Sequence, residues 1–507
     1  MAFLKKFLTV LLLAVILVTT VSCGRGEESD TSVNSVDDNF VDFYGYKIPK
    51  GLNYNDAEIT ILTTETASSH NSYQIVPYSN PAYDETAAAA RVVASANVAR
   101  AVEEALGVKL NEEIIFTWNR YGGEMYLQLQ RDAIAGTCDY LFATPCIIEG
   151  AMLAREDMLY DLANIVDLKE EWWCQPFNDS LAVSGKYYMA TGDLGTISRD
   201  ATLFVAFNKK MAESYHITES YGYSDLYEMV DDKAWTQDVM FEMAKSVYHD
   251  NNQNHICDPG DINGVSGQIG MVFWLLRSGG ESICALDGDG IPYLSVGSER
   301  SVALIEQAQR YLQDPAVGFI CADDYFNLSS IPVSDVIVPE FKADRCLFFM
   351  NAILNLELIR DMESDFGVIP CPLYDSTQDN YNSNVGAWSC NAICIPTAVD
   401  EADLEMAGHI ISALSAASRE ILTPVYYEQT LQYQITRDED SMRMLDIIFE
   451  NRTPDLCEVF QFGKMKDVVN NMITAKVGTF VSSFEAAKDA TIADIEETVE
   501  AFESNIN

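Results

Sequence analysis

The alternation of apolar and polar positions predicts that strands and helices follow one another along most of this chain. An apolar run at 58–63 predicts a buried first strand, and apolar positions with helical spacing over 84–106 predict a helix. Asp84 is the expected N-cap of this helix, and Gly107 marks its expected end. Strands that alternate with helices favour an α/β fold with a largely parallel sheet. The alternation continues with strands at 108–110 and 114–116, a helix at 122–135 and a strand at 138–144.

A similar pattern restarts in the second part of the chain. The segment 201–213 predicts a strand that leads into a helix, and Thr236 is the expected N-cap of a helix further on. Apolar stretches at 366–374 and 392–398 predict strands that end at prolines. Because 507 residues are too many for one ordinary core, we expect two or three domains. Amphipathic helices are expected at 401–418, 441–451 and 484–504.

The first 22 residues have the three parts of a secretory signal peptide. Lys5 and Lys6 supply a positive charge, an apolar run follows over 7–18, and small residues lead to Cys23. The apolar run is too short to span a bilayer comfortably, although an uncleaved membrane anchor is the alternative interpretation.

The sequence Val21-Ser22-Cys23-Gly24 resembles a bacterial lipobox, with Thr20 where that pattern has an apolar residue. The resemblance implies cleavage before Cys23 and attachment of a diacylglyceryl group to its sulfur. Two acyl chains anchor a protein stably, so this would hold an exported protein on the outer face of the bacterial cytoplasmic membrane. Residues 24–55 are rich in Ser, Asp, Glu, Asn and Gly and predict a flexible tether.

The formal net charge of −45 argues against nucleic-acid binding, because a phosphate backbone would be repelled. The same charge suits a body that is held away from an anionic membrane surface. The chain has twelve cysteines and no CxxC pair, which argues against a zinc ribbon. The eleven cysteines other than Cys23 are interpreted mainly as small core residues.

Several motifs, taken in order, resemble those of the extracellular solute-binding proteins of ABC importers, in the family that binds sugars. Phe207-Asn208-Lys209 resembles the YNK step of that family, and 233–236, KAWT, resembles a typical helix start. The stretch 365–370, with Pro372, resembles a conserved strand of the family, whereas 344–346 departs from the usual Gly-Lys-Ala. Weaker matches are Ala135-Gly136 with Asp139-Tyr140, Ser278-Gly279-Gly280, 287–290 and 341–350.

This resemblance implies a two-lobed periplasmic-binding-protein-like fold of type II, with an interlobe hinge and the ligand between the lobes. Chain crossings are implied near 195–200, 385–390 and 425–430. The implied function is capture of a small solute, with a sugar or oligosaccharide as the expected class, and delivery to the membrane subunits of an ABC permease. A monomer without catalytic activity is expected. The implied organisation is a signal peptide at 1–22, the anchored Cys23 and tether over 23–55, a first lobe of 56–195 plus about 390–425, and a second lobe of 200–385 plus about 430–507.

A sugar site needs flat apolar faces for the C–H groups of the ring and polar groups for its hydroxyls. Three of the six tryptophans are candidates for stacking: Trp118, Trp274 and Trp388. Packing in the core is the alternative role for each of them. Position relative to the family adds Glu65, Thr144, Asn351 and Tyr426.

The segment 250–261 has oxygen donors at the spacing of an EF-hand-like calcium loop. His255 stands where that loop has glycine, and the last position is an aspartate instead of the usual glutamate. A structural Ca²⁺ ion is one interpretation, and a metal-free Asn/Asp turn is the other. The candidate ligands are Asp250, Asn252, Asn254, the carbonyl of Ile256, Asp258 and Asp261.

Motifs for catalysis are missing from the sequence: there is no HExxH, GxSxG, Walker A or GxGxxG pattern. Two alternative functions stay open, which are a surface glycan-binding or glycan-hydrolysing lipoprotein without a transporter, and a structural surface lipoprotein. The residues do not identify the ligand, since the strong acidity would also suit a cationic or a neutral solute.

Overall fold

A computed structural model of the chain describes residues 39–65, 74–117, 119–329, 331–432 and 439–505. Within it, Val41–Asn507 form one compact unit. The predicted signal peptide and Cys23 lie outside the described residues. No helix among the described residues is both long enough and apolar enough to cross a membrane.

The first sheet has three parallel strands in the order β4-β3-β5. They are β3 (Ala57–Glu65), β4 (Val108–Phe116) and β5 (Phe142–Thr144). Helix α2 (Ala90–Leu106) lies between β3 and β4 in the sequence and ends at Gly107. Gly107 has a φ of 65°, a left-handed conformation that glycine adopts without a steric penalty. The predicted first strand and the predicted helix end are confirmed.

Two local predictions in this part differ from the structure. The two short strands expected at 108–110 and 114–116 are one continuous strand, β4, whose first residues alternate between buried and exposed. Asp84 does not cap α2, because the N-cap is Ala89. Instead, the Asp84 carboxylate accepts the backbone N–H of Thr86 at 3.0 Å in a turn upstream of the helix.

The second sheet has five strands in the order β10-β7-β11-β6-β12. Strands β10, β7 and β11 are parallel, whereas β6 is antiparallel to both of its neighbours. The sheet is therefore mixed and less parallel than predicted, because the antiparallel strand β6 lies inside it. The strands are β6 (Leu203–Asn208), β7 (Asn263–Gly267), β10 (Phe319–Cys321), β11 (Cys346–Ala352) and β12 (Phe366–Ile369).

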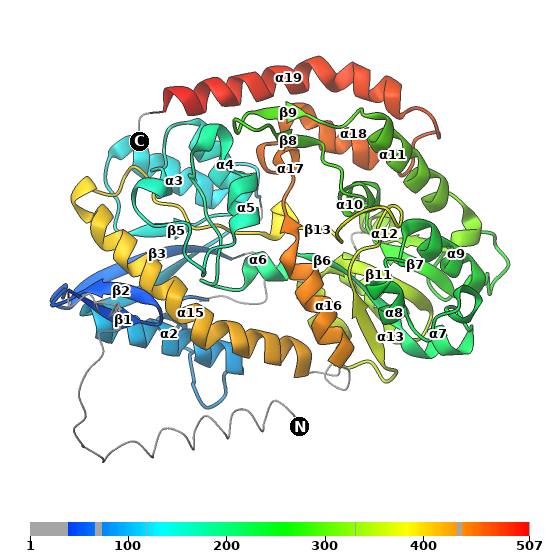
Figure 1. Cartoon of the computed structure of the whole chain (residues 1–507), viewed down its shortest axis with the longest axis horizontal. Coiled ribbons are helices and arrows are strands. Elements are labelled where there is room, and N and C mark those ends of the chain that lie inside the picture. Colours follow the sequence, from blue (N-terminus) through cyan, green and yellow to red (C-terminus); the bar gives the residue numbers. More distant parts are fainter. Residues whose placement is uncertain (1–38, 66–73, 118, 330, 433–438, 506–507) are drawn as a thin grey trace, which may run out of the picture. The chain divides into compact units, whose positions relative to one another are not determined.

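Helices cover the second sheet, and its three inner strands, β7, β11 and β6, are almost completely buried. Helix α9 (Gln237–Val247) packs against β7 and β11, and α13 (Val333–Lys342) packs against β11 (Figure 1). The side chain of Thr236 accepts the N–H of Val239 at 3.4 Å, so the predicted N-cap of α9 is confirmed.

Three segments connect the regions around the two sheets. Helix α6 (Ile197–Asp200) leads into β6. The segment around Cys394 leads back from the second sheet to the first, because Cys394 forms an antiparallel bridge with Ala143 in β5. Helix α15 (Leu404–Gln432) packs beside α2 (Figure 1), and it contributes Leu422 to the core of the first sheet and Tyr426 to that of the second.

The remaining elements surround these sheets (Figure 1). The other strands are β1 (Phe40–Phe43), β2 (Tyr46–Pro49), β8 (Cys284–Leu286), β9 (Pro292–Leu294), β13 (Ser383–Asn384) and β14 (Arg452–Thr453). The other α-helices are α3 (Glu124–Ala135), α4 (Ile147–Arg155), α5 (Gln175–Ser180), α7 (Lys209–Ser214), α8 (Leu226–Asp231), α10 (Met271–Ser278), α11 (Glu299–Leu312), α12 (Ala322–Ser329), α14 (Leu356–Ile359), α16 (Glu439–Glu450), α17 (Leu456–Phe460), α18 (Met465–Asn471) and α19 (Phe480–Ser504).

Candidate functional site

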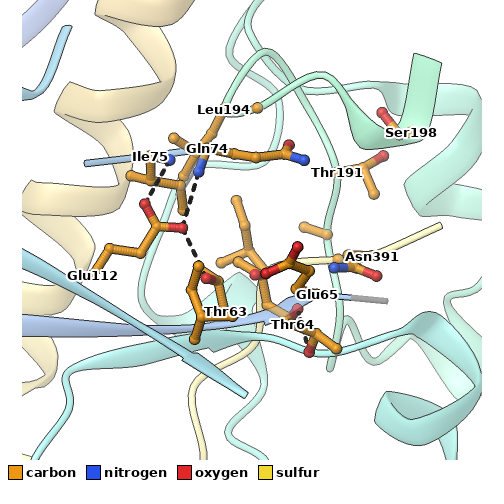
Figure 2. Close-up of a pocket in the computed structure, with 16 residues that line it drawn as sticks. Thr63, Thr64, Glu65, Gln74, Ile75, Glu112, Thr191, Leu194, Ser198 and Asn391 are labelled. Carbon is orange, nitrogen blue, oxygen red and sulfur yellow. Dashed lines mark hydrogen bonds between the residues drawn. The ribbon is translucent and has the colours of Figure 1, made fainter. Parts of the chain in front are cut away.

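A pocket lined by both polar and apolar side chains lies at the carboxyl ends of the first-sheet strands (Figure 2). Glu65 is the last residue of β3, and Thr144 is the last residue of β5. Carboxyl ends of parallel strands meet at one edge of a sheet, which is where α/β folds bind small molecules. The same sheet also supplies Thr63 and Thr64 from β3 and Glu112 and Ile114 from β4. Other segments complete the pocket wall with Gln74, Ile75, Ala190, Thr191, Leu194, Gly195, Ser198, Asn391, Ala392 and Ile393.

Glu112 holds one wall of this pocket in place (Figure 2). Its buried carboxylate accepts the backbone N–H groups of Gln74, Ile75 and Val76 at 2.6–3.0 Å. It also accepts the hydroxyl of Thr63 at 2.7 Å. Burial raises the pKa of Glu112, and these donors oppose the rise because they stabilise the charged form. Glu112 therefore has a structural role, fixing the segment at Gln74 against β4.

Several polar atoms of the pocket are available to a ligand. Among the described residues, the hydroxyl of Thr191 and the side-chain oxygen of Asn391 are buried and have no hydrogen-bond partner. Burial raises the pKa of Glu65, whose carboxyl group is directed into the pocket (Figure 2). Buried polar atoms normally find partners, so these groups are suited to bind water or the hydroxyls of a ligand.

The pocket is narrow in this conformation. The space that a water-sized sphere can enter is about 40 Å³, which holds only a few water molecules. A sugar ring would therefore need either a wider pocket or an additional surface beside it.

An aromatic pair provides such a surface. The rings of Tyr121 and Trp388 lie with their centroids 5.3 Å apart and tilted by 51°. The two residues are 49% and 40% exposed, although both are large and apolar. Trp388 lies three positions before the pocket residue Asn391. Asn391 in turn forms an antiparallel β-bridge with Cys146, which lies two positions after the pocket residue Thr144. Exposed aromatic groups next to a polar pocket are typical of a binding surface.

Local hydrogen bonds fix the loop that carries Tyr121. The side-chain oxygen of Asn119 accepts the N–H of Tyr121 at 2.9 Å, and the hydroxyl of Thr117 lies 2.8 Å from the carbonyl oxygen of Asn119. Gly123 has no room for a side chain, since an added Cβ would lie 2.0 Å from that same carbonyl oxygen. The loop thus presents Tyr121 in a defined position.

An ion pair between the partly buried Lys466 and the buried Glu458 lies close enough to influence Tyr121. Lys466 donates to the carboxylate of Glu458 at 2.6 Å, and Asn384 donates to the other oxygen at 3.3 Å. Burial opposes the charge of Lys466, but Glu458 outweighs this effect and raises the pKa of the ammonium group. Burial raises the pKa of the Tyr121 hydroxyl, and Lys466 partly offsets that rise.

The structure brings together only some of the residues that the sequence predicts for the ligand site. Glu65 and Thr144 line the pocket, and Trp388 belongs to the aromatic pair. Trp118 lies outside the described residues. Trp274 lies on α10, half-buried, with its indole against Gly270, where an added Cβ would be 3.0 Å from its Nε1.

Asn351 and Tyr426 are buried away from the pocket lining. The side-chain oxygen of Asn351 accepts the N–H of Ala352 and the amide of Asn355 at 2.7–2.8 Å. Tyr426 is 1% exposed and donates to Asp200. Ligand contact by these two residues stays a prediction.

Neither Tyr121 nor Asn391 is among the site residues predicted from the sequence. Tyr121 directly precedes Gly122-Gly123, and an aromatic residue before a Gly-Gly turn could have indicated an exposed ring in a binding loop. The sequence around Asn391 contains no such signal. Asn391 reaches the pocket only because its segment pairs with Cys146, which is distant in the chain.

The predicted calcium loop forms a compact turn. The amides of Asn252 and Asn254 both donate to the Asp258 carboxylate, at distances between 2.7 and 3.4 Å. Asp250 accepts the N–H of His255 at 2.8 Å, and His255 has a φ of 62°. The histidine therefore adopts the left-handed conformation for which that loop position usually has glycine.

The last predicted calcium ligand is less available. Asp261 is fully buried, and its two oxygens accept the N–H groups of Asn251 and Asp258 at 2.9 and 3.2 Å. Within the described part of the chain, no three His, Cys, Asp or Glu side chains are arranged to hold a metal ion. The residues fit a calcium ion only in part. The amide N–H groups of Asn252 and Asn254, which are not metal ligands, face Asp258, and the carboxylates of Asp250 and Asp261 both accept backbone N–H groups.

The fold is the two-lobed, periplasmic-binding-protein-like α/β fold, as comparison with solved structures shows. The chain is similar to the ABC substrate-binding protein Lmo0181 from Listeria monocytogenes in complex with cycloalternan, with a TM-score of 0.54 and 14% identity, covering 87% of this chain and 99% of that chain. It is also similar to a cyclo/maltodextrin-binding protein complexed with maltotetraose, with a TM-score of 0.53 and 12% identity over 88% and 98% of the two chains.

A third similar structure is the cyclic alpha-maltosyl-1,6-maltose binding protein from Arthrobacter globiformis, with a TM-score of 0.51 and 11% identity over 87% of this chain and 99% of that chain. No protein-family model and no curated protein matches the sequence. At these identities the likeness establishes the fold, and the predicted fold class is confirmed. All three similar structures are of binding proteins.

Proposed function

We propose that this protein is the substrate-binding lipoprotein of an ABC importer and captures a sugar or oligosaccharide between its two lobes. The fold supports this proposal, because the structures that share it were solved for proteins that bind cycloalternan, maltotetraose and a cyclic maltosyl-maltose. The observation that carries it is the exposed aromatic pair of Tyr121 and Trp388, of which Trp388 lies three positions before the pocket residue Asn391.

The chemistry of a sugar matches this combination. A pyranose has apolar C–H faces that pack on aromatic rings and hydroxyl groups that exchange hydrogen bonds with polar side chains. Tyr121 and Trp388 would supply the flat faces, while Glu65, Thr191 and Asn391 would supply acceptors and donors. The narrow pocket would widen as the lobes move about their connections, which is a hinge motion.

Titration calorimetry and thermal shift against linear and cyclic oligosaccharides test this proposal directly. Specific binding must raise the melting temperature, because the ligand binds the folded state only. Trp388→Ala and Tyr121→Ala should each weaken the affinity by about tenfold or more, which corresponds to about 1.4 kcal/mol of lost stacking. Tyr215→Ala removes an aromatic ring that is 43% exposed elsewhere, and should leave the affinity unchanged.

Other outcomes of the same experiment discriminate between functions. Release of smaller sugars from an oligosaccharide would identify a hydrolase and contradict the proposal. A screen that includes amino acids and polyamines would show whether the strongly acidic chain prefers a cationic solute. No stabilisation by any small solute would favour a structural surface lipoprotein.

The proposal includes export and a lipid anchor at Cys23. The signal-peptide pattern of the first 22 residues and the polar sequence that follows support this localisation. The anchored monomer would deliver its ligand to the membrane subunits of a permease. Mass spectrometry of the mature N-terminus tests the anchor: an acylated Cys23 is expected, and an intact Met1 would contradict it.

A structural Ca²⁺ ion in the loop at 250–261 is also part of the proposal. The spacing of oxygen-bearing side chains supports it, and His255 supplies the turn; the amides of Asn252 and Asn254, whose N–H groups now face Asp258, would have to turn their oxygens to the ion. Because Asp261 is engaged by the backbone, the loop offers fewer charged ligands than a complete EF-hand and should bind weakly.

A further inference from the structure

Three side-chain oxygens of the pocket at the end of the first sheet are available as hydrogen-bond acceptors. Glu65 directs its carboxyl group into the pocket (Figure 2). The hydroxyl oxygen of Thr191 and the side-chain oxygen of Asn391 line the same pocket and have no hydrogen-bond partner among the described residues. Thr191 is only 4% exposed and Asn391 only 8%. A buried acceptor without a donor destabilises a protein, so a ligand that brings donors would be bound favourably here.

The charge of this pocket is negative. Among the described residues that line it, only Glu65 and Glu112 have ionisable side chains. Backbone N–H groups already surround the carboxylate of Glu112. The nearby cation Arg199, which follows the lining residue Ser198, forms an ion pair with Asp193. Glu65 is therefore the carboxylate to which a cationic group of a ligand would bind, and an anionic group would be repelled.

The size of the pocket selects a small group. Its cavity of about 40 Å³ holds only a few water molecules. A primary ammonium group is similar in size to a water molecule and has three N–H donors, which equals the number of available oxygens on Glu65, Thr191 and Asn391. We propose that this pocket binds the primary ammonium group of an amino sugar, with Glu65 as its counter-ion. The inference rests on the proposed function, which supplies the sugar.

The backbone of Thr191 is held by a buried asparagine. The N–H of Thr191 donates to the side-chain oxygen of Asn178 at 2.8 Å, and the amide of Asn178 donates to the carbonyl oxygen of Thr191 at 3.1 Å. Asn178 is itself fully enclosed in the protein. Both backbone groups of Thr191 are thus occupied, and its hydroxyl is the group that remains for a ligand.

The other two acceptors are also fixed through their backbones. Asn391 forms an antiparallel β-bridge with Cys146. Glu65 ends β3, and its carbonyl oxygen accepts the N–H of Thr117 at 3.0 Å. Since the three acceptors are positioned before a ligand arrives, little conformational freedom of the backbone is lost on binding.

This chemistry predicts an order of preference among sugars. Hydrogen bonds from an ammonium group to a carboxylate are about twice as strong as those between neutral groups, so an amino group should bind better than a hydroxyl group at the same position. An N-acetyl group has no charge and is larger than an ammonium group, so it should lose the advantage. A sugar carboxylate should bind worst, because Glu65 repels it.

Titration calorimetry on the full chain tests this order with matched pairs of sugars. The probes are glucosamine, galactosamine and the β-1,4-linked disaccharide of glucosamine, each compared with glucose, galactose and cellobiose, at about pH 6.5, where the amino groups are charged. The members of each pair differ only by an amino group in place of a hydroxyl group on each ring. The amino sugar should bind about tenfold more tightly than its partner. N-acetylglucosamine and glucuronate should show no such gain.

Two variants on one strand assign the preference to the pocket. Glu65→Gln should bind amino sugars and their hydroxyl partners with equal affinity, because it removes the counter-ion and keeps the shape of the side chain. Glu58→Gln removes the same charge from an exposed position near the start of β3, and it should keep the wild-type preference. Melting temperatures without a ligand verify that both variants fold. An unchanged preference in Glu65→Gln would overturn the proposal.

The remaining outcomes separate this proposal from the proposed function. If linear or cyclic glucose oligosaccharides bind, and the amino sugars bind no more tightly than their partners, the ammonium site is wrong and the proposed function stands. If no saccharide of either kind binds, both are contradicted. Putrescine supplies ammonium groups without a sugar. Tighter binding of putrescine than of every amino sugar would identify a site for amines alone and would also contradict both.

Discussion

The hydroxyl of Tyr426 donates a 2.9 Å hydrogen bond to the carboxylate of Asp200, and this bond joins the long helix α15 to α6. Asp200 also accepts the hydroxyl of Thr196 at 3.0 Å and lies 3.8 Å from the guanidinium of Arg91. Both helices belong to segments that connect the regions around the two sheets. The bond therefore lies in the part of the molecule that any movement between these regions must involve.

Tyr426→Phe should destabilise the protein by about 1–3 kcal/mol, because it removes a donor from a buried carboxylate while keeping the ring. Urea denaturation measures this loss. Tyr293→Phe removes a hydroxyl from a tyrosine that is 48% exposed on β9, and it should leave the free energy of unfolding unchanged. Equal stability of the two variants would contradict a structural role for the bond.

Glu112→Gln should destabilise the protein by about 3 kcal/mol, since it replaces a charged acceptor of three N–H groups and one hydroxyl. Glu113→Gln, on the exposed side of the same strand, is the matched control and should have no effect. Because Gln74 and Ile75 line the pocket, Glu112→Gln should also weaken ligand binding. Normal stability in Glu112→Gln would show that the pocket wall does not depend on this carboxylate.

The pH dependence of stability should contain a contribution from Glu149. Burial raises the pKa of Glu149 from 4.5 to about 7, although Arg120, 3.9 Å away, opposes this rise. The folded state therefore holds a proton that the unfolded state releases between pH 4.5 and 7. Stability from this group is complete below pH 4.5 and is lost as the pH rises through 7, by about 1–3 kcal/mol.

Urea denaturation at several pH values measures this effect. Wild type should lose stability between pH 5 and pH 7, and Glu149→Gln, which cannot titrate, should lose about 1–3 kcal/mol less over the same range. Glu113→Gln should keep the wild-type dependence, because that carboxylate is exposed. Identical curves for wild type and Glu149→Gln would show that Glu149 is already charged in the folded protein.

Local signals explain which features could be predicted from sequence. Gly107 ends α2 and Thr236 caps α9 as expected, because such ends depend on a few neighbouring residues. The apolar pattern at β6 predicted the position of this strand but not its direction in the sheet. The antiparallel pairing of β6 with β11 and β12 depends on where the chain enters the sheet, which the local sequence does not determine.

The candidate site was predictable only in part for the same reason. Glu65 and Thr144 were selected from their positions relative to the family, and each ends a strand whose place the apolar pattern predicts. The contact of Tyr121 with Trp388 joins segments that are far apart in the chain, so neither residue indicates the other. Tyr426 was selected from its position relative to the family, and the bond of its hydroxyl to Asp200 could not be predicted, because the two residues are far apart in the chain.

Calcium should stabilise the loop at 250–261 and raise the melting temperature at millimolar concentration, and a chelator should reverse the rise. The expected affinity is low, because Asp261 is held by the N–H groups of Asn251 and Asp258 and contributes no free carboxylate. Asp258→Asn should abolish the rise, since it removes the negative charge toward which the amides of Asn252 and Asn254 are directed. Replacement by asparagine keeps the shape of the side chain, so the loop should still fold.

Asp287→Asn is the matched control for this experiment. Asp287 also accepts backbone N–H groups in an exposed turn, at 2.9 Å, but it lies in the β8–β9 hairpin outside the predicted loop. Its variant should therefore keep the full response to calcium. Magnesium should replace calcium poorly, because it requires a regular octahedral set of ligands that an Asn-rich loop with one engaged aspartate does not provide. If calcium raised the melting temperature of Asp258→Asn as much as that of wild type, the ion would bind elsewhere on this acidic protein. The loop would then be a metal-free turn.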